Sequence, residues 1–463
     1  MDFYSNVALN SDISSIKYKF SMYNHVYKHN NGILLYNSLT GFKAHIFEKN
    51  LILQINKLKK GKLLSKDKID HRLIETKIAV EENLDETVIA DSLIKDNIAV
   101  NRYFLRLIIL PTRECNFRCV YCYENKRKEF MSDKLYLDIA SAIKAYLKNN
   151  PSIKTLEIEW FGGEPMLCYN EIVKFSTDMQ NYCHENDIYF YMAMTTNGYL
   201  LTKDKFLTLL DLGLKSYQIT LDGLKKHHDN LRVLKSGSGT WDTIFNNFKE
   251  INEIEDKEFN ITIRINYHLG MLDDMEDFLK LLKGNLDING KFSIYAIKIT
   301  PPPEKDLNID FVSNETDTMT IEYMLNLFNK LGISTTRYSP HLTPTGPVCY
   351  ARNNNTFVID TDGSIRKCTE YLEDDTINNI GTVENGVFNI NKDKLSQWLM
   401  PPQGLLNQKG CLNCPDYPTC CGGLCPIQWF RDKTIFCNDM ITLTENLLKI
   451  EYSTVKGTIN EGN

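Results

Sequence analysis

Three cysteines directly after an apolar run constrain this chain more than any other feature of its sequence. Cys115, Cys119 and Cys122 follow the apolar run Leu105–Pro111, which predicts a buried strand. Three thiolates within eight residues do not suit a disulfide framework, and their number and spacing are typical of the ligands of a cubane iron–sulfur cluster. A zinc site would need a fourth Cys or His nearby, and the next 40 residues contain neither. The sequence therefore predicts a four-iron cluster with three protein ligands, which leaves one iron open for chemistry.

The remaining cysteines favour metal binding elsewhere in the chain as well. The 463 residues include 13 cysteines, eight of them between residues 349 and 437, and carry a formal net charge of −6. We find no signal-peptide pattern and no apolar run long enough to span a bilayer, so we expect a cytoplasmic protein with no membrane partner, whose cysteines bind metal. The acidic balance argues against a nucleic-acid partner. Cys168 and Cys183 stand apart and are expected to be buried free thiols.

Between about residues 104 and 310 the sequence alternates strand-like and helical stretches, which predicts a parallel sheet joined by crossovers. The clearest helix begins after Ser132, a capping residue, and runs to Leu147 with its apolar residues on one face. The expected strands are Leu105–Leu110, Leu156–Phe161, Ile188–Met194, Ser216–Leu221, Ile261–Tyr267 and Phe292–Ile299. Six units fall short of the eight of a closed barrel, so we expect an open one.

Four segments at the ends of expected strands resemble the signature of radical S-adenosylmethionine (SAM) enzymes. They are the cysteine triad with Tyr121 before its last cysteine, the segment Trp160–Pro165 with its Gly-Gly-Glu-Pro sequence, and the segments Thr195–Gly198 and Ile219–Gly223. The resemblance implies an α/β fold with a partial (β/α)6 TIM-like barrel. It also implies that the triad holds a [4Fe–4S] cluster whose open iron binds SAM, and that reductive cleavage of SAM yields a radical that takes hydrogen from the substrate.

The same resemblance implies a set of SAM-binding residues, which comprises Gly162, Gly163, Glu164, Thr196, Asn197 and Arg264. The Gly-Gly-Glu segment would receive the methionyl ammonium, and the Thr-Asn pair is placed for the ribose or the carboxylate. Arg264 suits the methionyl carboxylate through its planar fork, and an ion pair at the barrel mouth is the alternative. Asp222 is interpreted only as a turn residue. No catalytic residue beyond the cluster ligands is assigned.

The cysteines between about residues 345 and 445 resemble the SPASM extension of radical SAM enzymes, which implies two auxiliary [4Fe–4S] clusters. One complete ligand set would be Cys411, Cys414, Cys420 and Cys437, and a second set, one ligand short, would be Cys349, Cys368 and Cys425. The spacing from Cys420 to Cys425 is one residue longer than usual, so either Cys420 or Cys421 is the ligand, or Cys421 fills the vacant position. Two zinc ribbons are the alternative for this region.

The first 100 residues contain no cysteine and read as strands followed by helices. Tyr23–Ile46 predicts hairpin strands, and helices are expected at Phe47–Leu58, Asp67–Val80 and Glu86–Asp96. This order resembles the peptide-recognition domain of ribosomal-peptide maturases, and a cap without a binding role is the alternative. The expected domains are an N-terminal α+β domain at 1–100, a radical SAM core at 104–310, a linker helix region at 311–344, a SPASM domain at 345–445 and a tail at 446–463.

The resemblances together predict a maturase that installs a crosslink, most often a thioether, in a ribosomally made precursor peptide. A low-potential donor such as flavodoxin or ferredoxin would supply the electron. The alternative within the class is an anaerobic sulfatase maturase, but those enzymes carry an acid directly after the Gx4C cysteine, where this chain has Thr369 and then Glu370. The alternative from another class is a non-catalytic iron–sulfur electron carrier, which would need no Gly-Gly-Glu-Pro segment.

Overall fold

The computed structural model describes residues 16–100, 103–255, 257–300, 309–334, 336–346, 348–423, 425–437 and 443–454. The chain divides into two compact units. The barrel unit comprises residues 100–334 and 353–399, and the composite unit comprises residues 1–99, 335–352 and 400–463. The end of the predicted tail lies outside the described residues. No helix in the described part of the chain is long and apolar enough to cross a membrane.

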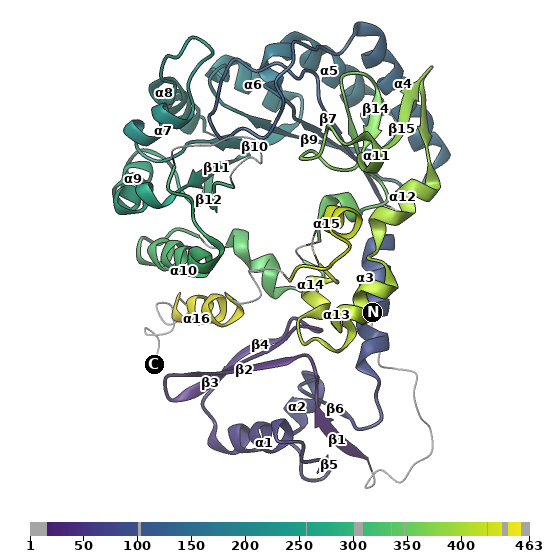
Figure 1. The fold of residues 1–463 in the computed structure, drawn as a ribbon, viewed down its shortest axis with the longest axis vertical. Helices are drawn as coiled ribbons and strands as arrows, with labels where there is room; N and C mark the ends of the chain where they lie inside the picture. Colours follow the sequence, from purple (N-terminus) through teal and green to yellow (C-terminus); the bar gives the residue numbers. More distant parts are fainter. Residues whose placement is uncertain are drawn as a thin grey trace. The chain divides into compact units, whose positions relative to one another are not determined.

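The barrel unit is built on a parallel sheet of the six expected strands. These are β7 (Phe104–Ile109), β8 (Thr155–Trp160), β9 (Tyr189–Thr196), β10 (Leu214–Thr220), β11 (Asn260–Tyr267) and β12 (Phe292–Lys298). They lie in sequence order, and each pairs with the next in parallel register. The crossover helices along the outer side of the sheet are α4 (Asp133–Asn149), α5 (Tyr169–Glu185), α6 (Lys203–Asp211), α7 (Lys225–Leu231), α8 (Trp241–Asn252) and α9 (Leu272–Asn285) (Figure 1). The partial TIM-like barrel is therefore confirmed.

Helix α4 shows why these segments take the conformations that the sequence predicts. The Ser132 hydroxyl accepts a hydrogen bond from the backbone N–H of Leu135 at 3.2 Å and so begins the helix. Ile139, Ile143 and Leu147 are buried on the face expected from their spacing. Each such side chain contributes roughly 1.5–3 kcal/mol when it leaves water, so the apolar face fixes the helix against the sheet.

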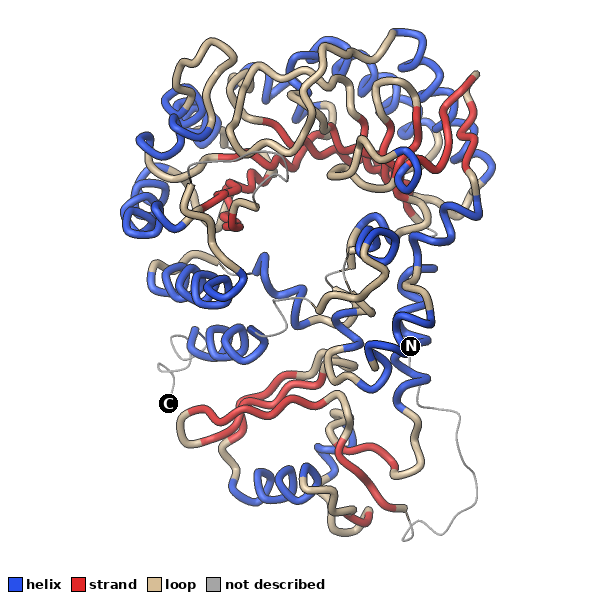
Figure 2. The backbone as a smooth tube through the Cα atoms, viewed as in Figure 1, coloured by secondary structure: helices blue, strands red, loops and turns tan. Residues whose placement is uncertain are grey.

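Four strands that the sequence did not predict extend the sheet beyond β7. Strand β13 (Thr356–Ile359) pairs in parallel with β7, and β14 (Ser364–Arg366), β15 (Asn379–Glu384) and β16 (Val387–Ile390) follow in antiparallel order. The result is a ten-stranded sheet, drawn in red in Figure 2. Helices α10 (Asn314–Lys330), α11 (Asp375–Asn378) and α12 (Lys392–Leu399) complete this unit.

The composite unit contains two three-stranded antiparallel sheets and several short helices. One sheet is β2 (Asn24–His29), β3 (Gly32–Asn37) and β4 (Lys43–Ile46), which confirms the predicted hairpin strands. The other sheet is β1 (Lys17–Phe20), β5 (Leu64–Ser65) and β6 (Ala79–Glu81). The helices are α1 (Lys49–Lys59), α2 (His71–Glu75), α3 (Glu86–Val100), α13 (Gln403–Lys409), α14 (Tyr417–Cys420), α15 (Pro426–Arg431) and α16 (Thr444–Thr454).

The expected helix over Asp67–Val80 is wrong in most of its length. Only α2 is helical, because Asp70 caps its start and Lys77 adopts a left-handed conformation with φ 59° just after its end. The apolar residues beyond it join strand β6 and pair with β1. Tertiary pairing therefore overrides the local helical pattern at this point.

Candidate radical SAM site

The predicted cluster ligands lie in the loop that follows β7. Cys115 is buried, and Cys119 and Cys122 are half-buried. The backbone N–H of Phe117 donates to the sulfur of Cys115 at 3.4 Å. Burial raises the pKa of Cys115 to about 12, so this thiol gives up its proton only to a group that binds it strongly, such as a metal.

The Gly-Gly-Glu segment packs directly against the backbone that leads into the cysteine loop. Gly163 N–H donates to Thr112 O at 3.1 Å, and Glu164 N–H donates to Glu114 O at 3.0 Å. A Cβ atom at Gly162 would lie 2.5 Å from Thr112 O, and one at Gly163 would lie 2.2 Å from Glu114 O. Gly162 also has φ 110°, which side-chain-bearing residues rarely adopt. Both glycines are therefore required for the close approach of these two loops.

Glu164 joins the ends of β8 and β9. Its carboxylate is completely buried and accepts hydrogen bonds from the Thr196 hydroxyl at 2.6 Å, the Asn197 N–H at 2.7 Å and the Met166 N–H at 3.0 Å. Burial raises the pKa of Glu164, and these donors act against that rise. The Asn197 amide in turn donates to the side-chain oxygen of Asn116 at 2.8 Å, inside the cysteine loop. Five of the six predicted SAM-binding residues thus surround the start of the triad.

A second buried network holds the other end of the cysteine loop. The Tyr121 hydroxyl donates to Asp222 and accepts from the side chains of Arg232 at 2.8 Å and Asn266 at 3.0 Å. Asp222 also accepts from the Asn266 N–H at 2.7 Å. Arg264, the sixth predicted SAM-binding residue, is attached to this network because its Nε donates to Asn266 at 2.9 Å. Asp222 is therefore more than a turn residue, because it connects the ends of β10 and β11 to the loop.

Two cations beside the triad escaped the sequence analysis. Lys126 is mostly buried, and the charges of Glu124, Cys122 and Cys115 raise its pKa against the opposing effect of burial. Arg232, just after α7, is 8% exposed and acts electrostatically on Cys119. The sequence could have suggested Lys126, because it lies four positions after the last cysteine of the triad. The placement of Arg232, in contrast, depends on the fold of a distant segment.

The C-terminal cysteines of the composite unit include one mutually interacting group. Burial, followed by the charges of Cys420, Cys414 and Cys437, raises the pKa of Cys411 to about 11. These are the four residues predicted as one complete ligand set. The backbone N–H of Gly423 donates to the sulfur of Cys420 at 3.3 Å.

Cys421 has different surroundings from Cys420. Its thiol is fully buried and donates to the backbone carbonyls of Pro418 at 3.6 Å and Thr419 at 3.8 Å, within its own turn. Its φ of 55° is left-handed and ends α14. This environment favours a structural thiol at Cys421 and a ligand at Cys420.

The residues of the second predicted ligand set are divided between the two units. Cys349 and Cys425 belong to the composite unit and Cys368 to the barrel unit, and all three are half-buried. The Cys368 sulfur accepts the N–H of Glu370 at 3.4 Å. Cys168 and Cys183 are buried free thiols, as predicted.

Comparison with known proteins agrees with the radical SAM interpretation of the barrel unit. Residues 109–282 match the model of the Radical SAM superfamily. An uncharacterized protein of Methanocaldococcus jannaschii is 28% identical over 272 residues, covering 57% of this chain and 84% of its own length. A cysteine-type anaerobic sulfatase-maturating enzyme of Clostridium novyi is 26% identical over 345 residues, covering 69% of this chain and 87% of its own. The solved structure of native anSMEcpe with bound AdoMet and Cp18Cys peptide has a TM-score of 0.58 at 18% identity and covers 77% of this chain and 99% of that one, so it shows the shared fold.

The residues of the site suit the cofactors of this superfamily. Three soft thiols, two neighbouring cations and a backbone N–H directed at Cys115 match the needs of an anionic iron–sulfur cluster. Within the described residues no three His, Cys, Asp or Glu side chains converge on one metal ion. Cubane thiolates bind separate irons and need no such convergence. The chain thus carries a radical SAM domain over residues 109–282, and it is similar to a sulfatase-maturating enzyme over most of its length.

Proposed function

We propose that this enzyme takes hydrogen from a ribosomally made precursor peptide and installs a thioether crosslink between a cysteine sulfur and a carbon. When bound, SAM and the [4Fe–4S] cluster supply the radical that removes the hydrogen. Cys115, Cys119 and Cys122 would hold the cluster. Glu164 would keep the strand ends and the cysteine loop in the geometry that receives SAM, and Arg264 would meet its carboxylate.

The choice of a peptide substrate rests on one observation. Within the composite unit, a folded strand-and-helix segment contacts the part of the chain that carries the C-terminal cysteines. The Tyr23 hydroxyl donates to Leu412 O at 3.4 Å, and His25 pairs with Asp416 at 3.3 Å. The sheet β2-β3-β4 ends in two edge strands, and edge strands can pair with an extended peptide. Support also comes from anSMEcpe, which shares the fold and was solved with a peptide bound.

The C-terminal cysteines would complete the electron balance of this reaction. Forming a thioether from a C–H and an S–H bond removes two hydrogens from the peptide, one to the SAM-derived radical and one as a thiol proton with an electron left over. We assign that electron to auxiliary [4Fe–4S] clusters. Cys411, Cys414, Cys420 and Cys437 would hold one of them. The second, held by Cys349, Cys368 and Cys425, would have an open iron for the substrate thiolate.

The sulfatase-maturase alternative rests on the relative from Clostridium novyi. Against it stands Thr369, at the position where those enzymes carry an acid. Glu370 comes next and is exposed. The electron donor in the proposal is a flavodoxin or a ferredoxin.

A peptide assay with mass spectrometry tests the proposal. The reconstituted enzyme, SAM and dithionite are incubated with a short Cys-containing peptide encoded next to this chain, and with the same peptide carrying Cys-to-Ser changes. We expect the first peptide to lose two hydrogens in mass and to resist thiol alkylation, and the second to stay unchanged. An aldehyde on the peptide would instead support the sulfatase-maturase alternative, and uncleaved SAM would support the electron carrier.

A further inference from the structure

The cysteine loop is supported by a segment that no motif of the sequence marked. Residues 231–235 run alongside the loop and exchange backbone hydrogen bonds with it. Arg118 N–H donates to Val233 O at 2.8 Å, and Val120 N–H donates to Leu231 O at 2.9 Å. This pairing carries the side chain of Arg232 into the interior of the barrel unit, next to the triad.

Arg232 is buried and only partly satisfied there. Its Nη1 donates to the Tyr121 hydroxyl at 2.8 Å, and its guanidinium carbon lies 5.7 Å from the centroid of the Phe117 ring. Its Nε atom is buried and has no hydrogen-bond partner among the described residues. Leaving a buried donor without a partner costs free energy, so this N–H suits an acceptor that arrives with a ligand.

The charged groups around Arg232 indicate that this ligand is the cluster held by the cysteine triad. Burial lowers the pKa of Arg232, but the nearby acidic groups, which include Cys119 and Asp222, outweigh burial and raise it, so the guanidinium stays charged. Arg232 in turn has the largest charge effect on Cys119, where burial raises the thiol pKa and Asp222 acts more weakly.

His228, another neighbour of Asp222, adds no charge to the network. His228 accepts the Asp222 N–H at its Nδ1 at 3.1 Å, and its Nε2 lies 3.0 Å from the Thr240 hydroxyl. Burial, with Arg232 nearby, lowers its pKa well below the usual value, so the ring is neutral. Among the cations near the cysteine loop, Arg232 has a larger charge effect on the ligand Cys119 than Lys126 has, and a larger one than the carboxylate of Asp222.

We propose that Arg232 is a positioning residue for the radical cluster: its buried charge, held at Tyr121 and Phe117 of the cysteine loop, would raise the reduction potential of the cluster, and its unpartnered Nε would supply a hydrogen-bond donor to it. A nearby cation and hydrogen bonds to sulfur favour the electron-rich, reduced form. This inference deepens the proposed function and rests on the assignment of the cluster to the triad.

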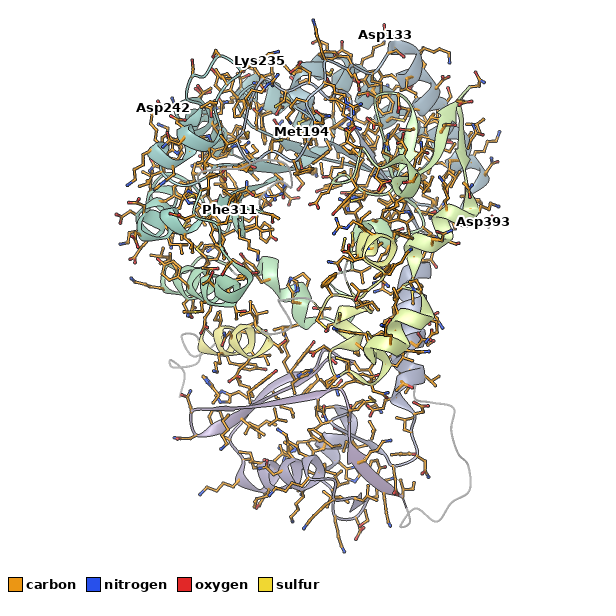
Figure 3. The ribbon with its side chains drawn as sticks, in the orientation of Figure 1. Asp133, Met194, Lys235, Asp242, Phe311 and Asp393 are labelled. Atoms are coloured by element: carbon orange, nitrogen blue, oxygen red, sulfur yellow. The ribbon has the colours of Figure 1, made fainter. Side chains whose placement is uncertain are left out.

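Three variants isolate this effect in the full-length reconstituted protein. Arg232→Met alone would remove the cation that acts most strongly on the buried carboxylate of Asp222 and is at risk of misfolding. We therefore compare Asp222→Asn with the double variant Asp222→Asn/Arg232→Met, so that only the cation differs between the two. Arg232→Lys keeps the charge but removes the Nε donor. Lys235→Met is the matched control, because Lys235 lies on the same segment with an exposed side chain (labelled in Figure 3).

The readout is a redox titration followed by paramagnetic resonance, in which the signal that changes on adding SAM identifies the radical cluster. At a fixed solution potential we expect the reduced-to-oxidised ratio to fall about tenfold from Asp222→Asn to the double variant, which is about 59 mV for one electron. Arg232→Lys should fall in between, and Lys235→Met should match the wild type.

Two results would overturn the inference in different ways. Equal potentials in Asp222→Asn and the double variant, with SAM-responsive signals in both, would show that Arg232 has only a structural role. A wild-type protein without any SAM-responsive cluster would instead remove the proposed function as well. Near-native circular dichroism confirms that the double variant is folded. An unfolded double variant beside a folded Asp222→Asn would show that Arg232 is needed for folding itself, which also overturns the inference.

Discussion

Arg113 and Asp360 form a buried ion pair within the barrel unit, although 247 residues separate them in the sequence. Arg113 Nε donates to Asp360 at 2.8 Å, and its Nη2 donates to the other carboxylate oxygen. Arg113 precedes the first cluster cysteine by two residues, and Asp360 follows strand β13. The pair therefore fixes the start of the cysteine loop to the strand that extends the sheet beyond β7.

Replacing Asp360 with Asn should destabilise the barrel unit by about 3–5 kcal/mol, because it leaves a buried guanidinium with only the exposed Glu373 as a charge partner. Asp360 also accepts from Arg366 at 2.9 Å, which increases the expected loss. Asp375→Asn is the matched control, since Asp375 pairs with the same Arg366 but its side chain is 71% exposed. Denaturant unfolding should show the large loss only for Asp360→Asn. Equal losses in the two variants would contradict the importance of the buried pair.

The same pair predicts a pH dependence. Burial alone would raise the pKa of Asp360, but the hydrogen bonds and charge of Arg113 outweigh it and hold the pKa below its ordinary value. A depressed carboxyl pKa gives stability that is present above the unfolded-state pKa of about 3.9 and is lost as the pH falls through the folded-state value. The difference in melting temperature between the wild type and Asp360→Asn should therefore be constant from neutral pH to about pH 5 and shrink below about pH 4. A constant difference down to pH 3 would argue against this ion pair.

Glu164→Gln should weaken both the fold of the site and SAM binding. The amide group of Gln cannot accept from the Thr196 hydroxyl and the Asn197 N–H at both of its ends, so one buried donor loses its partner at a cost of about 1–3 kcal/mol. Calorimetric SAM titration of the reconstituted protein and its melting temperature check this together. Glu171→Gln on α5 is a surface control, and unchanged melting and SAM affinity in Glu164→Gln would contradict the assigned role.

Cys420→Ala and Cys421→Ala separate the ligand from the structural thiol. Because Cys420 belongs to the group around Cys411 and Cys421 donates within its own turn, only Cys420→Ala should lose iron, about four atoms per chain. Iron and sulfide counting on the two reconstituted proteins gives the answer. Loss of iron in Cys421→Ala alone would make Cys421 a cluster ligand and contradict the assignment. The vacant ligand position of the second cluster would then be filled by Cys421.

Deleting residues 1–95 should abolish peptide turnover while uncoupled SAM cleavage continues. The structure adds a second consequence, because the Tyr23 hydroxyl donates to Leu412 O and His25 Nε2 lies 3.3 Å from Asp416 Oδ1, beside Cys411 and Cys414. The truncated protein should therefore also lose iron from its C-terminal cysteines. Iron counting alongside the peptide assay tests this, and full iron content with unchanged turnover would show that the segment is only a cap.

Periodicity and motif spacing predicted the six barrel strands because apolar residues recur along each strand between turns, as on β8, where Leu156, Ile158 and Trp160 are buried and alternate with less buried residues. Met194, labelled in Figure 3, is buried on β9 for the same reason. Strand β14 escaped prediction because Ser364–Arg366 is too short to show a period, and its pairing is set by neighbours.

The residues of the candidate site also divide into those that the sequence predicted and those that only the fold brings together. The cysteines and the Gly-Gly-Glu segment were visible because their chemistry needs fixed residue types at fixed spacing. Arg232 and Asp222 were not, since an isolated charge gains its role only when the fold brings it to a distant loop. The second role of Glu164, as an acceptor for the end of β9, likewise depends on strand order.

The most direct test of the account is SAM cleavage by the protein in which Cys115, Cys119 and Cys122 are all replaced by Ala. Reconstituted wild-type enzyme with dithionite and SAM should form 5′-deoxyadenosine, and the triple variant should form none while it keeps the iron of the C-terminal cysteines. Chromatographic measurement of 5′-deoxyadenosine, with iron counting on both proteins, gives the result. Wild-type levels of 5′-deoxyadenosine from the triple variant would contradict the assignment of the radical cluster to this loop.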